Sequence, residues 1–302
     1  MKNKNFIKIG AIACSILLIT SCNGGSDIEV DVTDNDTVQQ VENNIENVET
    51  NENKIEYSVP TPNELFDIVK LQGGELNIDL INSLDNQEKY IDTKSKALNF
   101  GVYSADIGYM SCFDHGIEFL KYTKAIEKLG NDLGISDVFD KDLMDRIENN
   151  EGDSDTLFLI SNQTYYDSYQ YLEENEKGTE LSLIICGGYI ESLFIVTHLV
   201  DKYSDDNPII DRIGDQKLVL ENIIDFCMTY MDDQSVNEVM SDLMELGKVF
   251  EDNMTFVESD AKVENEGDVT VLSGGGHFKM NEKAFNAIKE KITELRNKIT
   301  QN

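Results

Sequence analysis

The chain has 302 residues, with 58 acidic side chains against 25 lysines and arginines, which gives a formal net charge of −33. Hydrophobic residues make up 40% of the sequence, which is enough for a folded globular protein rather than a wholly disordered one. Binding to nucleic acid and attraction to anionic lipid headgroups are both disfavoured, because each depends on a surplus of lysine and arginine.

The first 22 residues have the pattern of an export signal. Lys2, Lys4 and Lys8 precede an apolar stretch of 11 residues from Ile9 to Ile19. This stretch is shorter than the roughly 20 apolar residues that span a bilayer. Its end, Ile19-Thr-Ser-Cys22, resembles the lipobox of a bacterial lipoprotein signal. The resemblance implies cleavage before Cys22 and attachment of lipid chains to its sulfur and to its new amino group.

The lipid on Cys22 sets the predicted location, which is the cell envelope. Several acyl chains, each stabilised by about 0.8 kcal/mol per buried methylene, give a stable anchor where one chain would be marginal. By the same resemblance, Asn23 after the cysteine favours the outer membrane, with the protein on the periplasmic or the surface side. An ordinary cysteine in a signal segment is the alternative interpretation of Cys22.

Residues 22–56 are predicted to form an acidic, disordered tether. Positions 23–56 contain ten acidic residues, one lysine and no aromatic residue, so they cannot bury enough apolar surface to offset the entropy of ordering. As a flexible coil such a segment spans about 30–35 Å. A surface-export signal and a plain solvated spacer are both open interpretations of its acidity.

Residues 57–302 are predicted to form one all-α domain. Apolar residues recur three and four apart between His115 and Gly134, between Val236 and Phe250, and along a last helix that starts after Asn281. This last helix is amphipathic, and we expect it to dock on the domain rather than to form a coiled coil. Only Val269–Leu272 suggests a strand. The expected architecture is an irregular helical bundle or a stack of α/α hairpins with tetratricopeptide-like packing.

Two helices are expected at the centre of the domain. The stretch 181–200 is apolar on all sides with Glu191 as its only formal charge, which is typical of a buried helix; a membrane span is the weaker alternative. The stretch 94–113 carries small side chains that would let another helix approach closely. These small residues are Ala97, Gly101, Ser104, Ala105, Gly108 and Ser111.

Four residues are candidates for a ligand site, each with a structural alternative. Glu191 and His198 would line a pocket in the apolar helix, or Glu191 would instead pair with one of the three arginines, Arg146, Arg212 or Arg296. Tyr165 and Tyr169 share one face of a helix and would stack on a ligand, or they would only border the core.

Other chemistry-bearing residues show no spacing typical of an active site. The three histidines, His115, His198 and His277, lack metal-ligand spacing, so we expect neither a metal nor a cofactor. Residues 273–277, Ser-Gly-Gly-Gly-His, would either cradle an anion at the start of the last helix or act as a hinge. Cys112, Cys186 and Cys227 are expected to be buried thiols, although one disulfide among them is an open alternative.

Two functional hypotheses follow, from different classes. The first is a membrane-anchored envelope lipoprotein whose helical domain binds a protein or a small ligand without catalysing a reaction. The second is an envelope enzyme in which Glu191 acts as a general acid or base in a helix-lined pocket. The scarcity of catalytic groups favours the first hypothesis, in which Cys22 carries the membrane contact.

Overall fold

The computed structural model describes residues 61–72, 75–113, 115–258, 262–266, 269–273 and 276–301. All of them belong to one compact unit. The predicted export signal, Cys22 and the tether of residues 22–56 lie outside the described residues, as do glycines 274 and 275 of the glycine-rich run.

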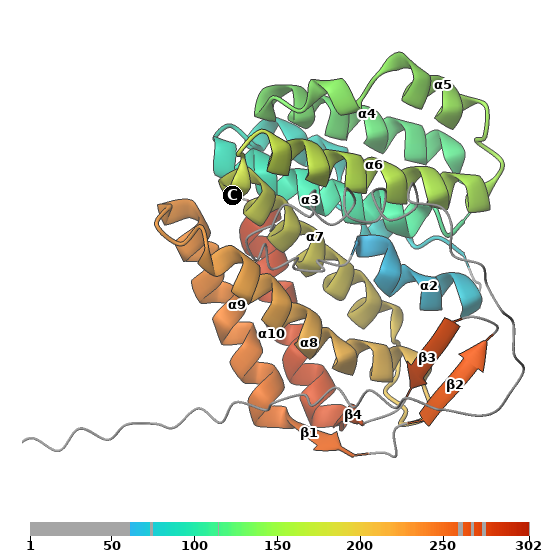
Figure 1. Ribbon diagram of the computed structural model, residues 1–302, viewed down its shortest axis with the longest axis vertical. Helices are drawn as coiled ribbons and strands as arrows, with labels where there is room; N and C mark the ends of the chain where they lie inside the picture. Colours follow the sequence, from blue (N-terminus) through green and yellow to red (C-terminus); the bar gives the residue numbers. More distant parts are fainter. Residues whose placement is uncertain are drawn as a thin grey trace, which may run out of the picture. The chain divides into compact units, whose positions relative to one another are not determined.

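The described part of the chain consists mainly of nine α-helices, which confirms the predicted all-α fold (Figure 1). Their bounds are α2 Pro62–Gln72, α3 Thr93–Met110, α4 Gly116–Leu133, α5 Lys141–Glu148, α6 Ser154–Glu174, α7 Gly178–Leu199, α8 Pro208–Met228, α9 Gln234–Asn253 and α10 Glu282–Thr300. Three short 3₁₀ helices complete the helical part, at Ile78–Leu80, Leu84–Lys89 and Ser136–Val138.

The segment between α9 and α10 contains more β-structure than the sequence predicts. Four strands are present: β1 Met254–Val257, β2 Lys262–Glu266, β3 Val269–Ser273 and β4 His277–Met280. β1 pairs antiparallel with β4, and β2 pairs antiparallel with β3, so the inner pair is nested in sequence within the outer pair. The prediction of a strand at Val269–Leu272 alone was therefore incomplete, because none of these four strands exceeds five residues and alternation over so few positions does not identify a strand.

Local capping fixes the helix ends where the sequence predicts them. Asn281 caps α10, since its side-chain oxygen accepts a hydrogen bond from the Ala284 amide at 3.0 Å. Gly134 ends α4 in the left-handed conformation, with φ of 75°, which glycine adopts without a steric penalty. Strand β4, His277–Met280, lies between the glycine-rich run and the start of α10.

Helix α7 lies at the centre of the fold, with α3 to α6 towards one end and α8 to α10 towards the other (Figure 1). Within the described residues it is the one helix long and apolar enough to cross a membrane, but 94% of its most apolar window is buried inside the protein. The expected buried core helix is therefore present, and its apolar surface faces neighbouring helices.

Glycines bring α3 and α7 into direct backbone contact. A Cβ atom on Gly101 would lie 2.6 Å from the Gly188 nitrogen and closer still to the Ile184 carbonyl oxygen. On the opposite helix, a Cβ atom on Gly187 would lie 2.8 Å from the Leu98 carbonyl carbon. The predicted close approach of a second helix to the small-residue face of α3 is thus confirmed, and α7 is that helix.

The amphipathic last helix docks on the domain as predicted. Its apolar seam is buried against α7 and α9. The buried members of this seam are Phe285, Ile288, Ile292 and Leu295. Docking of α10 also carries Arg296 to the middle of α7, where it meets Glu191.

Candidate functional site

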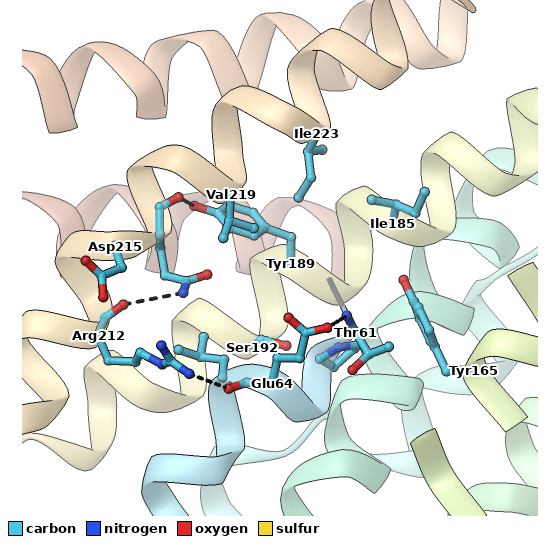
Figure 2. A pocket seen from close by; sticks show the side chains of 13 residues that line it. Thr61, Glu64, Tyr165, Ile185, Tyr189, Ser192, Arg212, Asp215, Val219 and Ile223 are labelled. Atoms are coloured by element: carbon cyan, nitrogen blue, oxygen red, sulfur yellow. Dashed lines mark hydrogen bonds between the residues drawn. The ribbon is translucent and has the colours of Figure 1, made fainter. Parts of the chain in front are cut away.

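A pocket of about 120 Å³ lies among α2, α6, α7 and α8 (Figure 2). It is the candidate site that the structure supports best, because it combines an apolar wall with several polar groups. Val219, Ile223 and Ile185 form the apolar side, and Thr61, Glu64 and Arg212 lie on the opposite side. Pro62, Leu65, Tyr165, Tyr189, Ser192, Asp215 and Gln216 complete the lining.

The start of α2 forms one edge of the pocket, and a local sequence motif fixes its geometry. Thr61-Pro-Asn-Glu64 is a capping-box sequence, with proline at the first helical position. The Thr61 amide donates to Glu64 Oε1 at 3.2 Å, and the Glu64 amide donates to the Thr61 carbonyl oxygen at 3.2 Å. The Thr61 hydroxyl oxygen is buried on the pocket wall and has no hydrogen-bond partner among the described residues.

Helix α8 supplies the cationic group of the pocket. Arg212 is exposed, and its Nη2 donates to the Glu64 carbonyl oxygen at 3.3 Å. This bond links α8 to α2 and uses one of the five donors of the guanidinium. In the described part of the chain, Arg212 has no ion pair with a carboxylate. Its remaining donors are therefore available to a ligand at the mouth of the pocket.

Two tyrosines line the pocket from α6 and α7. The Tyr189 hydroxyl donates to the Gln216 carbonyl oxygen at 3.1 Å, which holds its ring between α7 and α8. The Tyr165 hydroxyl forms no hydrogen bond within the described ranges, although the residue is buried. Burial raises the pKa of both hydroxyls, so both are protonated and neutral in the physiological range.

Glu191 lies on a different side of α7 and is fully buried against α10. Its carboxylate forms a bidentate ion pair with Arg296, with Nε to Oε2 at 3.0 Å and Nη2 to Oε1 at 3.1 Å. Arg296 is one of the three arginines that the sequence offered as a partner, and its guanidinium also lies 4.6 Å from the centroid of the Phe194 ring. Glu191 does not line the pocket among α2, α6, α7 and α8.

A second buried carboxyl, Asp106 of α3, joins this ion pair. Its Oδ2 accepts a hydrogen bond from the Asn82 amide at 3.1 Å, whereas its Oδ1 has no donor within reach among the described residues. Burial and the neighbouring Glu191 charge raise the pKa of Asp106 well above its usual value. A proton on Asp106 therefore allows its side chain to hydrogen-bond to the Glu191 carboxylate, and the cluster needs only Arg296 to balance its charge.

His198 and Tyr169 also lie outside the pocket lining. His198 Nδ1 is 2.7 Å from the Phe194 carbonyl oxygen, and its ring stacks on the Phe194 ring with centroids 4.1 Å apart. Burial lowers the pKa of His198, which favours the neutral ring. Tyr169 packs against Phe226, with centroids 6.5 Å apart. Of the four sequence candidates, Tyr165 alone lines the pocket.

The structure brings together two of the three cysteines that follow Cys22. Cys186 of α7 and Cys227 of α8 are buried, with their sulfur atoms 3.7 Å apart, and both are free thiols. Cys112 is half-buried, and burial raises the pKa of its thiol to about 12. Cys186 and Cys227 are therefore buried thiols, as the sequence predicts, whereas Cys112 is only half-buried.

No sequence pattern indicated that Thr61, Tyr189 and Arg212 line one pocket. The capping box at Thr61 and the scarcity of arginine were visible signals, but they did not indicate that α2 and α8 meet. In the described ranges, no group of three or more His, Cys, Asp or Glu side chains is arranged to hold a metal ion.

Comparison of the chain with protein-family models, with curated proteins and with solved structures finds no match. The inference of function therefore rests on the geometry of the chain itself.

Proposed function

We propose that this protein is a lipid-anchored lipoprotein of the bacterial envelope whose helical domain binds a small ligand without transforming it. The ligand site is the pocket among α2, α6, α7 and α8. The observation that carries this proposal is that one pocket combines an apolar wall with two polar groups that can bind a ligand. Among the described residues, the buried Thr61 hydroxyl has no hydrogen-bond partner, and the Arg212 guanidinium has no ion pair with a carboxylate.

The lipobox-like end of the export signal supports the membrane anchor. Lipid chains on Cys22 would hold the protein at the bilayer, and residues 23–56 would give the domain its reach. Thr61, at the edge of the pocket, follows this segment closely in sequence.

The surroundings of Glu191 weigh against the enzymatic alternative. A general acid or base must reach the proton of its substrate, at about 2.6–3.2 Å or through one water. Both oxygens of Glu191 are instead held by Arg296, and the side chain has no exposed surface. Such a paired and buried carboxylate is typical of a structural network between helices.

Membrane attachment is tested by fractionating cells that produce the native chain or the variant Cys22→Ala. The native chain should partition with membranes and incorporate labelled palmitate, whereas the variant should lose the label and leave the membrane fraction. Retention of the unlabelled variant in the membrane fraction would contradict the proposed anchor.

Ligand binding is tested by screening small metabolites for an increase in thermal stability, since a ligand that binds only the folded state stabilises it. A hit should be lost in Val219→Phe, which fills the pocket, and kept in Leu218→Phe. Leu218 lies next to Val219 on α8 but is 51% exposed and does not line the pocket. A hit that survives Val219→Phe would place the binding site elsewhere.

A further inference from the structure

We propose that the pocket takes a free α-amino acid with a small apolar side chain. In this arrangement the ligand carboxylate faces Arg212, its ammonium group faces Glu64, and its side chain packs against the apolar wall. The inference rests on the proposed function and names the class of ligand for the same site.

The size of the pocket limits the ligand to a few heavy atoms. Its volume is about 120 Å³, and an apolar cavity of about 150 Å³ is known to hold benzene. An aliphatic side chain such as that of leucine or valine therefore fits within it. The charged head of the same molecule would then lie at the mouth, where Glu64 and Arg212 are exposed.

The walls of the pocket separate apolar from polar groups, as an amphiphilic ligand requires. Figure 2 shows Val219, Ile223 and Ile185 on one side of the pocket, across from Arg212 and Glu64. A ligand of this size can therefore bury its hydrocarbon part and keep its polar atoms near charged side chains. Neither half of such a ligand would have to displace an existing ion pair of Arg212 or Glu64 in the described residues.

The charges at the mouth favour a zwitterion over an ion of one sign. Arg212 and Glu64 lie together, and the guanidinium already donates to the Glu64 backbone. A purely anionic ligand would bring its charge close to the exposed Glu64 carboxylate, and a purely cationic one would bring its charge close to Arg212, so each would meet repulsion that a zwitterion avoids. The chain also carries a net charge of −33, so a simple anion meets further repulsion.

Two hydroxyl groups complete the proposed recognition. The Thr61 oxygen is buried, lacks a partner among the described residues and lies immediately before the first residue of α2, where the helix dipole favours negative charge. It can donate its proton to the ligand carboxylate. The neutral Tyr165 hydroxyl, which also lines the pocket, can donate to or accept from the same head group.

The test is calorimetric titration of the lipidated full chain in detergent with L-leucine and with its two half-ligands. 4-Methylpentanoate lacks the amino group, and 3-methylbutylamine lacks the carboxylate. L-Leucine should bind saturably at one site, and each half-ligand should bind about tenfold or more weakly, because each loses one charged hydrogen-bonding group.

Two arginine variants provide a matched pair. Arg212→Gln should weaken L-leucine binding about tenfold or more, whereas Arg146→Gln should leave it within about twofold. Arg146 is also exposed, but it lies on α5 beside a different depression. Thr61→Val, which keeps the shape and removes the hydroxyl, should weaken binding without changing the unfolding temperature of the free protein appreciably.

Several results would overturn the inference. These are a failure of both L-leucine and L-valine to bind, equal binding of a half-ligand, or unchanged binding in Arg212→Gln. If another metabolite from the screen binds and is lost in Val219→Phe, the ligand class is wrong while the proposed function stands. If no screened compound binds the native chain and Cys22 carries no lipid, the proposed function fails as well.

Discussion

Substitution of Gly101 by alanine should destabilise the fold through the crossing of α3 and α7. The added Cβ would lie 2.6 Å from the Gly188 nitrogen and closer still to the Ile184 carbonyl oxygen, whereas ordinary contacts begin at 3.4 Å, so the two backbones must separate by more than about 0.8 Å. A gap of about 0.5–1 Å forfeits a quarter to a half of each dispersion contact along the crossing. Overpacking of this kind costs about 1–3 kcal/mol, and we expect the upper end because the clash involves backbone on both sides.

The higher helix propensity of alanine, about 1 kcal/mol, offsets part of this cost. The expected net loss in the free energy of unfolding is therefore about 2 kcal/mol, or a decrease of about 4–8 °C in the unfolding temperature for a domain of this size. The measurement is urea or thermal unfolding followed by circular dichroism of the helical signal.

Gly247→Ala is the matched control. Gly247 lies within α9, and a Cβ atom added there would have Leu220 Cδ2 as its nearest neighbour at 3.9 Å, an ordinary contact. This variant should gain about 0.5–1 kcal/mol from helix propensity alone. Equal effects of the two substitutions, or a Gly101→Ala variant as stable as the native chain, would show that backbone contact at this crossing does not stabilise the fold.

Three further predictions concern the buried charges. Arg296→Met should lower the free energy of unfolding by about 3–5 kcal/mol because it leaves Glu191 buried without a partner, and adding Glu191→Gln should recover part of the loss in the same urea assay. Because burial raises the folded-state pKa of Asp106, its contribution to stability is present below its unfolded pKa, about 3.9, and is lost as pH rises through the folded value. Asp106→Asn, which keeps the acceptor for the Asn82 amide and donates to Glu191 at every pH, should therefore gain stability relative to the native chain as pH rises above about 4; a difference that does not change with pH would contradict this. The pKa of His198 is lowered, so the contribution of its neutral ring is present above pH 6.5 and lost as pH falls through the folded value; an NMR titration midpoint at or above 6.5 would disagree.

Features that depend on neighbours along the chain could be predicted from the amino-acid sequence. Periodicity three and four apart predicted α4, α9 and α10, and residue type predicted the cap at Asn281 and the end of α4 at Gly134. The apolar character of 181–200 on all sides, with Glu191 as its only formal charge, predicted that α7 would be buried. The periodicities and caps depend on contacts within one or two turns of the chain, and the burial of α7 depends on its own composition, so a sequence pattern records each of them directly.

Contacts between distant residues became known only from the folded arrangement of the helices. The sequence left three arginines open as partners of Glu191, and the docking of α10 selected Arg296, which is 105 positions away. The pocket likewise needs Thr61 beside α2, Tyr165 from α6 and Arg212 from α8 at one place, and no local pattern relates them. The physical reason is that helix packing depends on which faces fit one another across the core, and this fit is a property of all the helices together rather than of any one segment.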